Sequence, residues 1–405
     1  MPSAVSSREV AVDPFSPAHL GPVRLKNRFI KAATFEGRAR GGVVTEDLIE
    51  FHRAFAEGGV GLTTLAYCAV SDDGRGAPHE IVVNEGCLPG LRVLADTVHH
   101  AGAAVSIQLG HAGPVGVTLG LGLAPSRRWV GRALRFLREA SEEDLRRIVR
   151  NFGKAATLAL DAGFDAIELH FGHGYLVSAF LSPRLNKRRD AWGGTVQGRA
   201  RLAREIAAHV RQQVGQAMAV TAKLNMSDGV KGGLAVEESL EVARLLESDG
   251  HLDALELSGG SSFENPMYLF RGDVPLAEMA ASVPPWLRLG FWLFGRRFLR
   301  AYPFEELFFL PLARRFRATL RLPLILLGGL NRLSSVRTAM QEGFDFVAMG
   351  RALLREPNLI ARWARGDTSD GLCIHCNKCM ATIYRGTHCV LVPPEERPGL
   401  PLGHR

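Results

Sequence analysis

Short segments of nearly continuous hydrophobic residues recur along the chain, and each follows a stretch with helical periodicity. In three of them a glycine ends the helix, a hydrophobic residue and an aspartate follow, and four or five apolar positions come next: AGFDAIELH at 162–170, DGHLDALELSGG at 249–260 and EGFDFVAMGR at 342–351. Apolar strands that alternate with helices are typical of a parallel sheet covered on both faces. The pattern therefore predicts repeated strand–helix units.

Eight strands of this kind are expected. The other five lie at 27–34, 60–68, 103–109, 218–226 and 322–329, and helical segments lie at 141–162, 196–214, 235–248 and 333–343. Ser141 and Asp144 have the spacing of a capping box. We therefore predict an α/β fold, a TIM (β/α)8 barrel over residues 13–366, with an open doubly wound sheet as the alternative. Residues 1–12 are expected to form a flexible tail.

Two segments depart from this regular pattern. Residues 261–321 are too long for one barrel loop and are predicted to be an insertion, and residues 367–405 a Cys-rich C-terminal extension. In WLRLGFWLFGRRFLRAYPFEELFFLPLARRF, at 286–316, aromatic residues are interleaved with arginine. Three interpretations stay open: a helical lid over a substrate pocket, an amphipathic patch facing a membrane, and a surface that binds nucleic acid. The lid is preferred because the segment leaves the end of the barrel where the active site is expected.

The composition suits a folded enzyme. The chain has 405 residues, of which 46% are hydrophobic, and a net charge of +8. It starts without the apolar core of a secretion signal and contains no apolar run long enough to span a bilayer, so we expect a cytoplasmic protein. Residues 286–321 carry eight arginines against two glutamates. This basic stretch indicates either an anionic partner or a solvated face.

The functional groups of a TIM barrel gather at the C-terminal ends of its strands. Small or polar residues stand at nearly every strand end here: Ala32, Ala33, Thr34, Ala66, Gln108, His170, Lys223, Gly328, Gly329, Gly350 and Arg351. Backbone N–H groups after the last two strands, with the charge of Arg351, suit a phosphate, although ordinary turn glycines are the alternative. Gln108 and Lys223 suit the polar edge of a planar heterocycle that gains electrons.

Two histidines and a tyrosine, His170, His173 and Tyr175, follow one strand. Metal binding would need a third ligand, and we expect the nearby Glu168 to point to the opposite face of the strand. As hydrogen-bond donors, the two imidazoles would hold an anionic oxygen of a substrate, and Tyr175 could supply a proton. Buried histidines satisfied by backbone groups are the alternative, which explains a single histidine better than this group of three.

These residues lie in segments that resemble the Old Yellow Enzyme family of FMN-dependent NAD(P)H oxidoreductases. The resemblance is carried by NRF at 27–29, IQLGHAG at 107–113 and ELHFGHGYLVSAFLSPRLNKRRDAWGGTVQGRARLAREI at 168–206. The layout is closest to the 2,4-dienoyl-CoA reductase branch without its second flavin domain. The resemblance implies FMN as cofactor and NAD(P)H as reductant. It implies that His170 and His173 bind the electron-withdrawing oxygen of the substrate and that Tyr175 donates a proton.

The same resemblance implies how the cofactor is held. Gln108 and Lys223 would contact the pyrimidine edge of FMN, and its phosphate would be bound by Gly329, Gly350 and Arg351. The other strand-end residues complete the expected cofactor site: Ala32, Ala33, Thr34, Ala66, His170 and Gly328. The chain departs from the family at Lys223, where many members have arginine, and at Phe35, where many have a threonine or cysteine that tunes the flavin. These departures concern the redox potential and the substrate.

Four cysteines near the C-terminus have the spacing of a metal-ligand set, C-x2-C-x2-C-x9-C: Cys373, Cys376, Cys379 and Cys389. The segment resembles the iron–sulfur segment of the 2,4-dienoyl-CoA reductase branch, although the spacing differs. A 4Fe–4S cluster, a zinc ion and a metal-free group of thiols all stay open.

The leading functional hypothesis is an FMN-dependent NAD(P)H oxidoreductase that reduces the activated C=C bond of an enone or enoyl thioester. The substrate is expected to be a small apolar molecule with an electron-withdrawing carbonyl, which receives a hydride from flavin N5 and a proton from Tyr175. The alternatives are an RNA-modifying flavin barrel similar to the tRNA dihydrouridine synthases, motivated by the basic insertion, and a non-catalytic flavoprotein. No nucleic-acid partner is expected under the leading hypothesis, whereas peripheral membrane contact and a homo-oligomer stay open.

Overall fold

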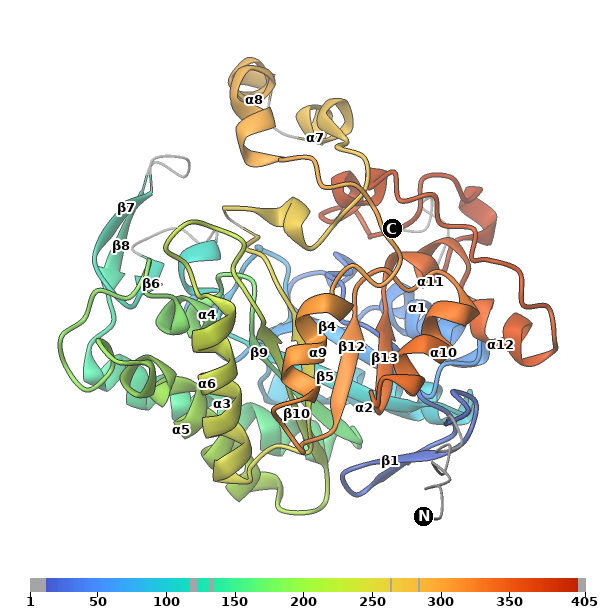
Figure 1. Ribbon diagram of the computed structural model, residues 1–405, viewed down its shortest axis with the longest axis horizontal. Helices are drawn as coiled ribbons and strands as arrows, with labels where there is room; N and C mark the ends of the chain where they lie inside the picture. Colours follow the sequence, from blue (N-terminus) through green and yellow to red (C-terminus); the bar gives the residue numbers. More distant parts are fainter. Residues whose placement is uncertain (1–11, 117–121, 131–134, 263, 283–284, 400–405) are drawn as a thin grey trace, which may run out of the picture.

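Eight parallel strands close into a barrel at the centre of the protein (Figure 1). The computed structural model describes residues 12–116, 122–130, 135–262, 264–282 and 285–399. In the order β10-β11-β12-β13-β3-β4-β5-β9, the barrel strands are β10 (Ala219–Asn225), β11 (Ala254–Ser258), β12 (Leu324–Leu327), β13 (Phe346–Met349), β3 (Phe29–Lys31), β4 (Leu62–Ala69), β5 (Ala104–Gly110) and β9 (Ala166–Phe171). The predicted TIM barrel is confirmed, and the open sheet is excluded.

Helices surround the barrel (Figure 1): α1 (Glu46–Glu57), α2 (Leu88–His100), α3 (Glu142–Asp161), α5 (Val196–Val214), α6 (Val236–Asp249), α9 (Leu310–Arg317) and α10 (Leu333–Gln341). The capping box predicted for α3 is present, since the N–H of Asp144 donates to Ser141 Oγ at 3.1 Å and the N–H of Ser141 donates to Asp144 Oδ2 at 2.8 Å. The four helices expected from periodicity therefore exist close to their predicted limits.

The strand side chains divide between two cores because successive residues of a strand point to opposite faces. On β9, Ile167 and Leu169 pack under the helices, whereas Ala166 belongs to the barrel interior. Leu20 and Leu25, from the N-terminal hairpin of β1 (Ala18–Leu20) and β2 (Val23–Leu25), belong to this interior cluster. In Figure 1, β1 lies at the lower end of the barrel. Apolar side chains therefore fill one end of the barrel, and the polar side chains lie toward the other end.

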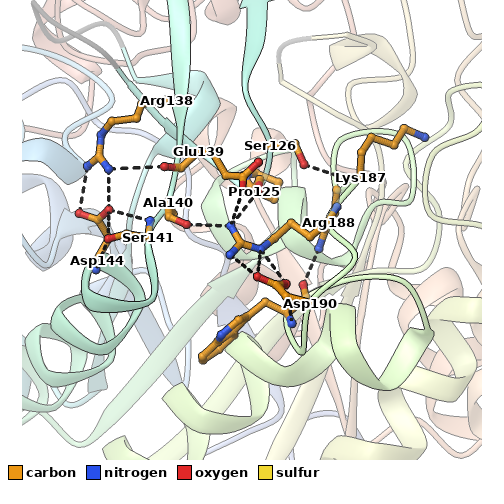
Figure 2. Close-up of polar contacts among 12 residues, drawn as sticks. Pro125, Ser126, Arg138, Glu139, Ala140, Ser141, Asp144, Lys187, Arg188 and Asp190 are labelled. Atoms are coloured by element: carbon orange, nitrogen blue, oxygen red, sulfur yellow. Dashed lines mark hydrogen bonds and ion pairs between the residues drawn. The ribbon is translucent and has the colours of Figure 1, made fainter.

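A small outer sheet stands beside the barrel, formed by β6 (Gly122–Ala124), β8 (Arg135–Glu139) and β7 (Arg128–Val130), and α4 (Leu176–Leu181) follows β9. Arg188 ties the chain after α4 to this sheet (Figure 2). Its guanidinium donates to the main-chain oxygens of Pro125 and Ala140 at 3.2 and 2.7 Å, and it pairs with Asp190 at 2.6 Å. The long segment that carries the family resemblance therefore also contains the arginine that holds the outer sheet.

The insertion between β11 and β12 contains two further helices, α7 (Leu276–Ser282) and α8 (Pro285–Phe298), which stand above the C-terminal end of the barrel (Figure 1). The extension follows α11 (Arg351–Arg355) and α12 (Leu359–Ala364) and packs against the insertion. Asn377 Nδ2 donates to the main-chain oxygens of Phe270 and Asp273 at 2.7 and 2.9 Å. No helix in the described part of the chain is long and apolar enough to cross a membrane.

The domain limits expected from the sequence stay predictions. The tail at 1–12 lies outside the described residues except for its last position, as do the final residues 400–405 of the extension. Within the described part, the extension contains only short 3-10 turns. It reaches back to the loop after the first barrel strand, because the N–H of Thr387 donates to the main-chain oxygen of Glu36 at 2.7 Å.

Candidate active site

His170, His173 and Tyr175 come together at the C-terminal end of β9. The ring centroid of His170 lies 5.1 Å from that of His173 and 4.5 Å from that of Tyr175. Tyr67, near the end of β4, packs against this group, with its ring 4.9 Å from Tyr175 and 6.0 Å from His170. The structure thus brings together the three side chains predicted as catalytic and adds a second tyrosine.

The backbone at His173 is fixed in an unusual conformation. Its φ of 62° lies in the left-handed region, which few residues other than glycine adopt. Asn225 Oδ1 accepts its N–H at 3.1 Å, and its carbonyl accepts the N–H of Ser262 at 3.0 Å. Its ring Nε2 lies 2.7 Å from Ser258 Oγ. Three neighbours from β10, β11 and the following loop therefore hold the turn that aims this imidazole.

Burial sets the protonation of all three side chains. It lowers the pKa of His170 well below the usual range, and His173 and Lys223 lower it further. Burial, followed by the charge of Lys223, lowers the pKa of His173 to about 3. Burial, followed by the charge of Glu80, raises the pKa of Tyr175 well above its ordinary value. At neutral pH the site therefore offers neutral imidazoles and a phenol that holds its proton.

Next to the histidines, the barrel interior contains a buried group of charged side chains. Lys223 Nζ lies 2.9 Å from Glu168 Oε1 and 3.0 Å from Glu256 Oε1, and Gln108 Nε2 donates to Glu168 Oε1 at 2.6 Å. All four side chains are buried. Burial and the neighbouring carboxylate of Glu168 raise the pKa of Glu256 to about 8. Glu256 is therefore mostly protonated at neutral pH, and Lys223 balances the charge of Glu168. This group, Gln108, Glu168, Lys223 and Glu256, is called the interior charge cluster below.

The expectation that Glu168 points away from His170 was wrong. The two residues are two positions apart and so share one face of the strand, and Glu168 bonds to Lys223 and Gln108 inside the barrel. No set of three His, Cys, Asp or Glu side chains within the described residues could hold a metal ion. The geometry therefore favours hydrogen bonding over metal binding for the histidine pair.

The strand ends fit FMN on two observations. Thr34 Oγ1 and His170 Nδ1 are buried and have no hydrogen-bond partner among the described residues, as expected where a polar ligand completes the site. Gly328 and Gly329 have φ values of 101° and 77°, which a residue with a side chain would adopt only under strain. Three other strand-end residues have short side chains: Ala32, Ala33 and Ala66. The unpartnered polar atoms and the short side chains suit a flat polar ring, and the two glycines suit its phosphate.

Two of the expected cofactor contacts are shared with the protein itself. Lys223 and Gln108 both bond to Glu168, so the lysine is already balanced by a carboxylate. Arg351 Nη1 donates to the main-chain oxygen of Arg271 at 2.8 Å and to Asn377. The Nε and Nη2 atoms of Arg351 take no part in these contacts and remain suitable for a phosphate. Lys223 would therefore meet a flavin as part of a neutral ion pair.

A pocket of about 660 Å³ opens beside Tyr67. Phe35 and Tyr384 form part of its wall, with their rings 6.0 Å apart, so the C-terminal extension contributes to it directly. Arg40 lies at its exposed side, and the buried Glu80 lines it as well. Burial raises the pKa of Glu80 to about 7. The pocket is large enough for a small molecule and adjoins the tyrosine that touches Tyr175.

Several of these residues were not predicted as site residues. Tyr67 and Ser258 stand at strand ends, so the signal that identified Gln108 could also have identified them. Glu80 and Tyr384 lie in irregular segments, where nothing in the sequence indicates that they reach the same pocket.

The predicted cysteine ligand set is not confirmed. Cys373, Cys376, Cys379 and Cys389 are free and half-buried, and the described residues form no metal-binding group. Burial raises the pKa of Cys379 to about 12, so its thiol keeps its proton. The loop is held instead by Asn377 and by the ring of His375, which is stacked on Phe304 at a centroid distance of 3.3 Å. A cluster or a zinc ion at these four cysteines is therefore not shown.

Comparison with known proteins tests the flavin interpretation. A profile of the NADH:flavin oxidoreductase / NADH oxidase family matches residues 13–253. The protein belongs to this family. Over 93% of this chain and 94% of the relative, it is 53% identical to a 4,4'-dithiodibutanoate disulfide reductase of Rhodococcus erythropolis. Membership of the NADH:flavin oxidoreductase / NADH oxidase family identifies the protein as a flavin oxidoreductase, and FMN and NAD(P)H are consistent with that family.

Two further matches extend beyond this chain. A multifunctional alkene reductase/demethylase OYE of Caballeronia cordobensis is 28% identical over 97% of this chain, which covers 54% of that protein. The structure of a 2-naphthoyl-CoA reductase has a TM-score of 0.79 at 24% identity, over 94% of this chain and 57% of that chain. The first match confirms the resemblance to Old Yellow Enzymes, and the second shows the shared fold. The chain spans little more than half the length of these two proteins.

Proposed function

We propose that the protein is an FMN-dependent NAD(P)H reductase of activated C=C bonds in small apolar molecules, with Tyr175 as the proton donor. The observation that carries the proposal is the buried grouping of His170, His173 and Tyr175, with ring centroids 4.5 and 5.1 Å apart. The relative from Caballeronia cordobensis is named an alkene reductase, which supports it. When bound, FMN supplies the hydride that originates from NAD(P)H. The cytoplasmic location expected from the sequence is part of this proposal.

In this proposal the two histidines hold the electron-withdrawing oxygen of the substrate. Both imidazoles are neutral, and each therefore carries one N–H donor. In His173, Nε2 lies 2.7 Å from the hydroxyl of Ser258, so a serine that donates there leaves Nδ1–H for the substrate. Two such donors stabilise the negative charge that develops on the oxygen when hydride arrives at the conjugated carbon.

Tyr175 completes the reaction by protonating the carbon next to the electron-withdrawing group. Its raised pKa makes it a weak acid, which suffices because the carbanion formed by hydride addition is a much stronger base than the phenolate. The phenolate then recovers its proton from water. A proton held on a buried phenol is also protected from premature exchange with the neutral imidazoles beside it.

A disulfide is the second candidate substrate, favoured by the relative that is 53% identical and named a 4,4'-dithiodibutanoate disulfide reductase. Hydride attack on one sulfur would break the S–S bond and give one thiol and one thiolate. A dithiodibutanoate has a carboxylate at each end, and Arg40 is exposed at the pocket beside Tyr67. Its guanidinium could bind such a carboxylate.

The two substrate classes differ in their need for Tyr175. A carbanion must be protonated before the product can leave. A thiolate with an ordinary pKa of about 8.5 is a weaker base than the phenolate of a tyrosine whose pKa is raised, so it leaves as an anion without taking the proton. Removal of the Tyr175 hydroxyl therefore separates the two reactions.

The test compares wild type with Tyr175→Phe, which keeps the ring that packs against Tyr67. We expect reduction of 2-cyclohexenone to slow by about 100-fold or more, while the reduction of bound flavin by NAD(P)H and the reduction of 4,4'-dithiodibutanoate stay unchanged. Rates are measured anaerobically by stopped flow. Tyr384→Phe, at the wall of the pocket beside Tyr67, is the matched control and should leave both acceptor reactions near wild type.

Two results would contradict the proposal. Enone reduction at the wild-type rate in Tyr175→Phe would show that another group donates the proton. A wild-type protein that reduces the disulfide but no activated alkene would assign the site to disulfides and remove the need for a proton donor.

A further inference from the structure

The outer face of α8 is unusual because three of its exposed residues are large and apolar. Leu289, Trp292 and Leu293 have exposed fractions of 73, 59 and 68%. Their spacing places them on one side of the helix, together with the exposed Arg296. Isolated exposed apolar residues are common on protein surfaces, but a cluster on one helix face marks a contact surface. This face, defined by Leu289, Trp292, Leu293 and Arg296, is called the α8 outer face.

The opposite side of α8 is already occupied. Phe291, Phe298 and the neighbouring Leu299 pack with Leu276 of α7 and with Met380 of the extension in one apolar cluster. Gly295 lies so close to α7 that a Cβ atom there would come within 2.8 Å of Leu276 Cδ1. The helix is therefore anchored to the rest of the protein by its inner side, and the α8 outer face has no role in holding it there.

The charged residues of α8 and of the segment that follows it are all arginines, and Glu278 of the neighbouring α7 pairs with Lys378. Residues 279–304 contain four arginines and no acidic residue. Arg288, Arg296 and Arg300 are exposed. A short helix with tryptophan and leucine on one face and arginine beside them has the composition of helices that lie in the interface of a membrane. The charges complement the negative surface of an anionic bilayer.

A second exposed aromatic group also suits contact with a broad surface. Trp129 of β7 and Phe136 of β8 are 48 and 56% exposed, and their rings lie 4.6 Å apart. In Figure 1, β7 projects from the same end of the barrel as α7 and α8. Two separated apolar projections at one end of the molecule suit a broad surface better than a pocket on a single partner.

We propose that the α8 outer face docks on an anionic lipid bilayer and holds the mouth of the barrel toward the membrane. A second copy of the chain is a poorer fit, since a symmetric contact would bring the arginines of the two α8 helices together, and α8 itself carries no acidic residue. The proposal depends only on this surface and holds whichever substrate the site reduces.

The test is flotation of the full-length protein with vesicles of phosphatidylcholine alone or mixed with phosphatidylglycerol. We expect wild type to float only with the anionic vesicles, and less at high salt because salt screens the arginines. Leu293→Asp should lower binding by about tenfold or more, with Leu289→Asp as a second variant of the same face. Val93→Asp is the matched control, since Val93 is 53% exposed on α2, and it should bind like wild type.

Three outcomes would overturn the proposal. The first is a wild-type protein that does not bind anionic vesicles at low salt. The second is equal binding by Leu293→Asp and Val93→Asp, which would show that charge alone acts. The third is a change in oligomeric state of Leu293→Asp in the absence of lipid, measured by light scattering, which would show that the face joins copies of the chain.

Discussion

The barrel interior and the outer segments of this protein are built in opposite ways. The interior charge cluster and the histidine turn are buried and held by hydrogen bonds of 2.6 to 3.1 Å between neighbouring strands. The insertion and the extension rest on each other, and several large apolar side chains there are exposed, such as Ile374 at 66% and Leu293 at 68%. The interior holds the side chains of the candidate site, whereas the insertion and the extension lie where a substrate would approach it. A change in the interior should therefore disturb the whole fold, and a change outside should act locally.

The largest effect is expected where the interior charge cluster loses its lysine. Lys223→Met would leave Glu168 buried without its counter-charge, and we expect the free energy of unfolding to fall by about 3–5 kcal/mol. Lys223→Arg keeps the charge and should cost less. Urea unfolding at neutral pH measures both. Equal stability of the two variants would show that the charge balance is not what holds this end of the barrel.

The interior charge cluster should also make the free energy of unfolding depend on pH. Because the pKa of Glu256 is raised to about 8 in the folded protein, the native state keeps a proton that the unfolded state releases at lower pH. The contribution of Glu256 to the free energy of unfolding is therefore largest in acid. It falls as the pH rises toward 8, by no more than about 1.4 kcal/mol per pH unit. Glu256→Gln should flatten the fall in unfolding free energy between pH 5 and 8.

A second titrating group and a control variant bear on that measurement. Glu80, whose pKa is raised to about 7, acts in the same direction and remains in the variant, so part of the slope should persist. The exposed Glu57→Gln should leave the slope unchanged. If Glu256→Gln retained the full wild-type slope, Glu256 would already be ionised below pH 8.

The smallest of these effects is expected in the extension. Asn377 is buried and donates to Phe270 and Asp273, and its φ of 56° makes glycine the least strained replacement. Asn377→Gly should lower the free energy of unfolding by about 1–3 kcal/mol and expose the extension to limited proteolysis while the barrel stays resistant. Asn358→Gly, at an exposed position without a side-chain cap bond, is the control. Global loss of protease resistance would show that the extension is part of the barrel's stability.

The repeated strands and helices could be predicted from the sequence, whereas contacts between segments that are distant in the chain could not. Apolar runs and helix caps follow local rules, so the eight strands and the start of α3 could be located. The histidine–tyrosine group was found because it lies within six residues. The pairing of Lys223 with Glu256 on β11 depends on the register of the two strands, which the sequence does not give. Tyr384 and Tyr67 line one pocket although they lie far apart in the chain. Cysteine spacing likewise predicted that the four thiols lie near one another, as their mutual effect on the pKa of Cys379 shows, but it could not predict whether their geometry suits a metal.

The central claim is that this barrel end binds FMN and passes electrons from NAD(P)H to a substrate. The most direct test is an anaerobic titration of the purified protein with FMN, followed by NADH and then NADPH, monitored by its visible spectrum. The account predicts one FMN bound per chain and bleaching of its absorption by at least one nicotinamide before any acceptor is added. A protein that binds no FMN, or whose bound FMN neither nicotinamide reduces, would contradict it.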